Sequence, residues 1–298
     1  MLWITWSLAM LGASTDDDAV GPAQASMAVE VRGCQWQATS ANFAVRNYHA
    51  SHDARRVAEH CERWRTKLQK YWIAAEQKPW VNKCDVVVHS GLSSYLAAVG
   101  AGARQTFGSS LIKFNSDKQV ARRLIDFRGD QAHGLAAVPH EMTHIIVADL
   151  LDGRQPPRWA DEGMAILADT HAKQMLHERD LTQGITSRAA FRVAELLTFE
   201  SYPQPSRIPA FYGQSASLTA CLAKRDDPSR FVEFLRRSLD DGYDKALRDV
   251  YHLDNVAQLE QLWHEQRLAL STANAGSGYH GVRLALDDAS ADLALRAQ

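Results

Sequence analysis

The stretch VPHEMTH, residues 138–144, places two histidines four positions apart, with a glutamate directly after the first. On an α-helix, residues four apart lie on the same face, one turn from each other. His140 and His144 can therefore both offer a ring nitrogen to one zinc ion, and Glu141 lies within reach of a water molecule at the same ion. The stretch predicts a helix that carries two metal ligands and a carboxylate able to move protons.

A second segment, PRWADEGMAILAD at residues 157–169, follows after a short connection and has the apolar spacing of an amphipathic helix. Catalytic zinc sites usually have three protein ligands and leave the fourth position to water. A carboxylate near the start of this helix completes the set, and Glu162 is the candidate. In the alternative interpretation, His140 and His144 are hydrogen-bonded core residues, and Glu162 is a carboxylate favoured by the positive end of a helix.

Together the two segments resemble the gluzincin division of zinc metallopeptidases, because the pattern HExxH at residues 140–144 is followed by WxxEG at residues 159–163. Pro139 before the first histidine, and the arginine before the tryptophan, are similar to small secreted peptidase-MA-like proteins of bacteria. The resemblance covers roughly residues 35 to 270.

This resemblance implies an α+β fold with a thermolysin-like catalytic core and zinc as the cofactor. It also implies hydrolysis of peptide bonds in a peptide or protein substrate by a metal-activated water, with Glu141 as the general base. Tyr212 is the candidate donor to the developing oxyanion; the alternative is a tyrosine packed in the core. The strand at residues 124–128 is expected to be an edge strand that lines the cleft and pairs with extended substrate.

Histidines that bind a metal normally donate their second ring nitrogen to a carboxylate or a carbonyl group. Asp169 lies seven residues after Glu162, on the same helix face, and is one candidate partner; Asp149 is the other. Both aspartates can equally lie on the surface.

Two other functions use the same ligands. A fourth protein ligand would close the site, as in a catalytically inactive zinc-binding interaction protein, and His133, His171 and His177 are the residues that could supply it. A zinc hydrolase that acts on a non-peptide substrate would share every ligand and differ only in the shape of its cleft.

Length and charge exclude several other classes. A chain of 298 residues can bury the core of one large domain, and its net charge of -2 with scattered arginine pairs gives no indication of nucleic-acid binding. The glycines at residues 100–105 lack the third glycine of a dinucleotide-binding motif and are interpreted as a loop. Oligomeric state is left open.

The N-terminus predicts export. Residues 1–14 form a short apolar run followed by small residues, typical of a signal peptide, although no lysine or arginine precedes the run. A secreted or periplasmic protein without a membrane span after cleavage is therefore expected. The alternatives are a buried N-terminal strand and a wrongly assigned start codon.

Export would favour disulfide formation. A bridge within Cys34, Cys61 and Cys84 is expected, with Cys221 left free. In a cytosolic protein the same residues would be ordinary buried thiols.

Hydrophobic periodicity divides the remainder of the chain. Residues 15–29 have no period and predict a linker; residues 30–272 form the metallopeptidase-like domain, and residues 273–298 form a flexible tail. The first half of the domain, residues 30–130, is α/β with a small mixed sheet: strands at 29–31, 43–48, 85–89 and 122–127, and helices at 53–71 and 92–99. The second half, residues 131–272, is helical, with further helices at 189–197, 214–223, 229–239, 246–251 and 256–270.

Overall fold

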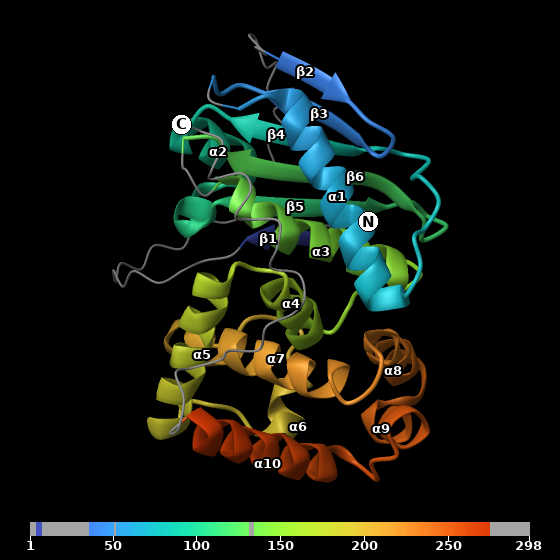
Figure 1. Cartoon of the computed structure of the whole chain (residues 1–298), viewed down its shortest axis with the longest axis vertical. Coiled ribbons are helices and arrows are strands. Elements are labelled where there is room, and N and C mark those ends of the chain that lie inside the picture. Colours follow the sequence, from blue (N-terminus) through green and yellow to red (C-terminus); the bar gives the residue numbers. More distant parts are fainter. Residues whose placement is uncertain (1–3, 8–35, 51, 131–133, 275–298) are drawn as a thin grey trace.

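A computed structural model describes residues 4–7, 36–50, 52–130 and 134–274 of the chain. The fold is α+β: a mixed sheet with its covering helices forms one half, and a group of helices forms the other (Figure 1). The predicted fold class is thus confirmed at this coarse level. The linker at 15–29, the strand expected at 29–31 and the tail from residue 275 onward lie outside the described residues.

Within the part of the chain that the structure describes, the sheet has six strands in the spatial order β1-β5-β6-β4-β3-β2. The strands are β1 (Ile4–Ser7), β2 (Trp36–Thr39), β3 (Phe43–Asn47), β4 (Cys84–His89), β5 (Gly108–Phe114) and β6 (Val120–Arg128). β3, β4 and β6 run parallel to one another, whereas β2 pairs antiparallel with β3, β5 with β6, and β1 with β5. The sheet is therefore mixed, as expected.

The sheet is covered by α1 (Ala54–Ile73) and α3 (Val138–Leu150), while α2 (Leu92–Val99) and the short helix η1 (Ala101–Gln105) follow β4. Asp53 starts α1, because its side chain accepts a hydrogen bond from the backbone N–H of Arg55. One face of α1 then buries Val57, Cys61 and Leu68. A short helix, η2 (Gly134–Ala137), leads directly into α3.

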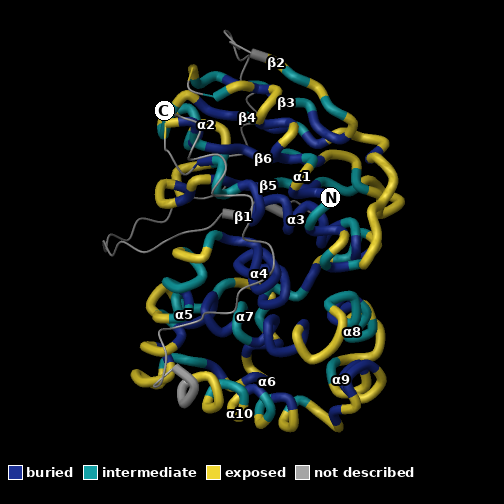
Figure 2. The backbone as a smooth tube through the Cα atoms, in the orientation of Figure 1, coloured by how far each residue is buried: buried dark blue, intermediate teal, exposed yellow. Residues whose placement is uncertain are grey.

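The helical half is built around α7 (Ile208–Ala223), which contacts α4, α5, α8 and α10. Its other elements are α4 (Arg158–Leu167), α5 (His171–Thr186), α6 (Val193–Leu196), η3 (Pro205–Arg207), α8 (Pro228–Asp241), α9 (Tyr243–Tyr251) and α10 (Val256–Asn274). Figure 2 shows α4 and much of α7 buried, and α10 with an exposed outer face. The helix predicted at 189–197 is confined to α6, because Arg188 has a left-handed φ of 60° and Arg192 is extended.

Aromatic rings join the two halves beside the helices that carry the motifs. Phe231 of α8 contacts Trp72 of α1 and Trp159 of α4, with ring centroids 5.8 Å and 5.9 Å apart. Trp159, the tryptophan of the second motif, is completely buried. α3 packs under the sheet and α4 against α7, so the two motif helices face each other across the junction (Figure 1).

The expectations about membrane spans and disulfide bonds can be compared with the described residues alone. Among the described residues, no helix combines the length and the apolarity of a membrane span. Cys61, Cys84 and Cys221 are buried thiols that form no disulfide with one another, and Cys34 lies outside the described part of the chain.

Candidate metal centre

α3 presents His140, Glu141 and His144 to the junction between the halves. The helix begins at Val138, and Pro139 occupies its first turn, where the missing N–H of proline costs no helical hydrogen bond. All three motif side chains are buried. The two imidazole rings lie one turn apart, with centroids separated by 5.0 Å, as the sequence spacing predicted.

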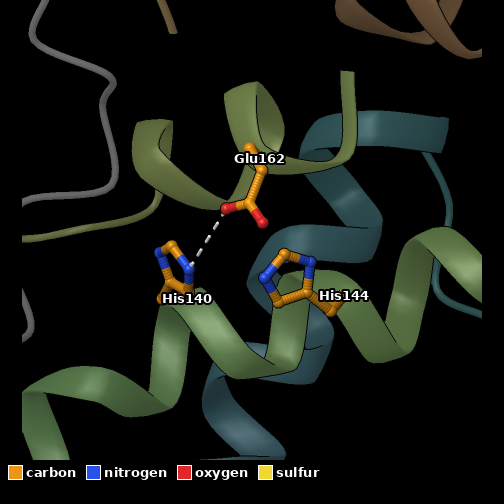
Figure 3. A group of neighbouring side chains, drawn as sticks. All are labelled: His140, His144 and Glu162. Atoms are coloured by element: carbon orange, nitrogen blue, oxygen red, sulfur yellow. Dashed lines mark ion pairs between the residues drawn. The ribbon is translucent and has the colours of Figure 1, made fainter. Parts of the chain in front are cut away.

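Glu162 of α4 points at the two histidines from the opposite side (Figure 3). Ligand atoms of His140, His144 and Glu162 all lie within 4.8 Å of one another, and His140 Nε2 is 4.0 Å from Glu162 Oε2. Donors on one zinc ion, each about 2 Å from it, lie roughly 3 to 4 Å apart. His140 Nε2 and Glu162 Oε2 are buried and make no hydrogen bond. These two atoms therefore fit the ligands of a cation.

Each histidine has a carboxylate on its outer nitrogen. His140 Nδ1 lies 3.0 Å from Asp169 Oδ2, and His144 Nδ1 lies 2.8 Å from Asp161 Oδ2. Such contacts fix the ring orientation and leave Nε2 for a metal. The proposed partner Asp169 is thus confirmed, whereas Asp161 was not foreseen although it directly precedes Glu162.

The other candidate partner, Asp149, has a different role. Trp80 Nε1 donates a 2.7 Å hydrogen bond to Asp149 Oδ2, and Arg123 of β6 forms an ion pair with the same carboxylate. Asp149 therefore ties the end of α3 to the sheet and was wrongly considered as a partner of a histidine.

Electric charge within the site favours a protonated His144 in the absence of a metal. Burial alone lowers the pKa of His144, but the Asp161 carboxylate outweighs burial and raises that pKa to about 9. Burial alone raises the pKa of Asp169, yet Lys173 and His140 together hold it well below its usual range. Asp169 thus carries negative charge beside the centre, which suits a divalent cation.

β5 positions the carboxylate of Glu141. Ser110 Oγ donates a 2.8 Å hydrogen bond to Glu141 Oε2, and both side chains are buried. Burial raises the pKa of Glu141, against the opposing effect of His140 and His144. Gly108 leaves room for this side chain, since a Cβ there would lie 2.9 Å from Glu141 Cγ.

Two tyrosines lie behind Glu162. Tyr202, between α6 and η3, donates a 2.5 Å hydrogen bond from its hydroxyl to Glu162 Oε1. The predicted oxyanion donor Tyr212 packs beside it, with ring centroids 5.9 Å apart, and is 2% exposed. The structure thus brings Tyr212 near the site and adds Tyr202, which sequence reasoning missed because a contact across forty residues has no local pattern.

Within the described residues, His140, His144 and Glu162 form the group of histidine, cysteine and acidic side chains that could hold a metal ion, and no fourth such residue joins them. His171 and His177 belong to α5 and are not part of this group. His133 lies outside the described residues.

The strand at residues 124–128 was expected at the edge of the sheet, beside the site, but the structure places it inside the sheet. β6, which contains residues 124–128, is internal because it pairs with β4 on one side and β5 on the other. The prediction of an edge strand there was wrong. β5 lies between β6 and the terminal strand β1, whose Thr5 and Trp6 stand opposite Leu111 and Ser110.

Two comparisons with known proteins give this chain no family. A scan against models of protein families and a search of curated proteins both found no match to the chain. A functional assignment must therefore come from the site itself.

Proposed function

We propose that this protein is a zinc-dependent peptidase of the gluzincin type with a thermolysin-like catalytic core. The observation that supports this best is the arrangement of the two histidines. Each has a carboxylate on its outer nitrogen, and His140 and Glu162 face each other with buried atoms that make no hydrogen bond. A general base, Glu141, stands on the same helix.

The donor set suits zinc, since two imidazoles and one carboxylate are a usual ligand set of hydrolytic zinc sites. His140, His144 and Glu162 would hold the ion, and no fourth ligand joins them among the described residues. Zinc in this position would supply a Lewis acid and lower the pKa of a bound water.

Glu141 is the proton carrier in this proposal. Its buried carboxylate would accept a proton from the attacking water and pass it to the leaving amine. The hydrogen bond from Ser110 engages Oε2 of Glu141, so that Oε1 can face the water. A raised pKa, caused by burial, suits a group that must take up a proton and release it in one cycle.

The hydroxyl groups behind the site have separate roles. Tyr202 would hold Glu162 in the orientation of a ligand, because its hydroxyl already donates to that carboxylate. Tyr212 would donate to the oxyanion that develops on the scissile carbonyl group.

An extended peptide would bind along β5. The backbone of β1 pairs antiparallel with β5 in the full-length chain, so this edge accepts an extended segment. Cleavage near residue 14, as the sequence predicts, would remove β1 and leave the edge to substrate. Peptides that bind there would pass close to Glu141, because Ser110 belongs to the same strand.

A mixed peptide library tests the proposal. Purified mature protein loaded with zinc should cleave peptides, lose the activity on chelation and regain it when zinc is added. Peptides that remain intact while simple esters or amides are hydrolysed would indicate a non-peptide substrate. Zinc binding without any hydrolysis would indicate an inactive interaction protein.

A further inference from the structure

A cavity of about 150 Å³ lies in the helical half, lined by residues of α4, α5, α7 and α10. None of the metal ligands lines it. Small side chains of α7 form one wall, namely Gly213, Ala216, Ser217 and Ala220, and the apolar residues around them include Ile166, Leu167, Met175 and Leu270. A cavity of this volume holds a molecule about the size of a single aromatic ring.

His177 of α5 supplies an unsatisfied polar group in this cavity wall. The side chain is 1% exposed, and neither ring nitrogen has a hydrogen-bond partner. Burial lowers the pKa of His177 to about 4, so the ring is neutral at physiological pH and offers one donor and one acceptor. A buried polar atom without a hydrogen-bond partner destabilises the folded protein. A ligand that hydrogen-bonds to the ring would recover this cost.

Two other polar side chains of the wall, Gln174 and Ser217, already have partners. Gln174 donates to the carbonyl groups of Leu167 and Asp169, and Ser217 accepts a 3.0 Å hydrogen bond from Trp263. These groups therefore do not require a ligand.

Charge around the cavity is close to balanced. Arg267 and Glu178 form an ion pair at 2.5 Å, so their charges cancel, and the remaining cation, Lys224, is an exposed side chain. A neutral ligand suits such surroundings better than a highly charged one.

We propose that this cavity binds a compact neutral aromatic molecule that carries one hydrogen-bonding group, with the ring against the small side chains of α7 and the polar group on His177. The site is separate from the metal centre and goes beyond the proposed peptidase activity. Because no metal ligand contributes to it, binding does not require zinc.

Two matched probes, phenol and toluene, test this site by calorimetric or NMR titration of the chelator-treated full chain. Both probes have the same benzene ring, but phenol carries a hydroxyl group where toluene carries a methyl group. The wild-type protein should bind phenol at least tenfold more tightly than toluene. His177→Phe removes the hydrogen bond but keeps an aromatic ring, so it should reduce that ratio to about one.

Ala216→Leu provides an independent control, because the larger side chain fills the cavity at a half-buried position. It should abolish binding of both probes while leaving the melting temperature and the zinc content close to wild type. Equal affinities for phenol and toluene in the wild-type protein, no binding of either, or unchanged phenol binding by Ala216→Leu would overturn the proposal.

Discussion

Asp161 would make metal binding at His144 depend on pH. It raises the pKa of His144 to about 9 in the metal-free protein, so zinc must displace a proton at any lower pH. Zinc affinity should therefore rise about tenfold per pH unit from pH 7 toward pH 9. The raised pKa has the opposite effect on the metal-free fold: its contribution to stability is complete below about pH 6.5 and is lost as the pH rises through 9.

Competition with a chromophoric chelator at several pH values measures this slope. Asp161→Asn removes the charge that raises the pKa and should flatten the slope between pH 7 and pH 9. A wild-type affinity that stays constant over this range would show that His144 is already neutral.

The two tyrosines behind Glu162 should be separable by substitution. Tyr202→Phe removes a hydrogen bond to a metal ligand and should weaken zinc binding about 10- to 100-fold. Tyr212→Phe should leave zinc content and KM nearly unchanged and lower kcat about 100-fold, because its hydroxyl would act on the transition state. Metal analysis and steady-state kinetics of the two variants measure both effects. A wild-type kcat in Tyr212→Phe would restrict Tyr212 to core packing.

Gly163, the glycine of the second motif, allows α4 and α7 to pack closely against each other. A Cβ at Gly163 would overlap Thr219 Oγ1 and lie 2.6 Å from the carbonyl oxygen of Ser215. Gly163→Ala should therefore lower the free energy of unfolding by about 1 to 3 kcal/mol. Gly102→Ala is the matched control, since a Cβ there meets nothing within 4 Å. Urea denaturation of both variants gives the comparison, and equal stability would mean that α4 and α7 can move apart without cost.

Elements with a regular apolar pattern could be predicted from the sequence, and others could not. The expected helix at 53–71 and strand at 85–89 correspond to α1 and β4, where apolar residues recur at the helix and strand periods. α5 was missed because it buries only His177, Leu181 and Gly184 and so shows no apolar stripe. β5 was missed because two of its buried positions, Ser109 and Ser110, are serines, which interrupt the apolar pattern.

In the candidate site, too, only the residues that belong to a local sequence pattern could be predicted. His140, Glu141 and His144 could be predicted because one helix turn fixes their spacing, and Glu162 because its flanking residues form a motif. Ser110 and Tyr202 reach the site from distant parts of the chain. Their contacts depend on how the sheet packs against the helices, which no local pattern records.

In the molecule as a whole, the candidate metal centre lies where the sheet half meets the helical half, and β5, which pairs with β1, reaches it through Ser110. We predict that export removes a leader near residue 14 and that one disulfide forms within Cys34, Cys61 and Cys84. Intact-mass measurement of protein from the periplasm or medium should show loss of the leader and of two hydrogen atoms per bridge. An intact N-terminus with four alkylatable thiols would identify a cytosolic protein.

Turnover and metal content of Glu141→Gln, measured beside the wild type, test the central claim most directly. The substitution keeps the size of the side chain and removes the base. We expect about one zinc ion per chain in both proteins, peptide cleavage that chelation stops in the wild type, and no cleavage by the variant. Cleavage by Glu141→Gln at the wild-type rate, or a wild-type protein that takes up no zinc, would contradict it.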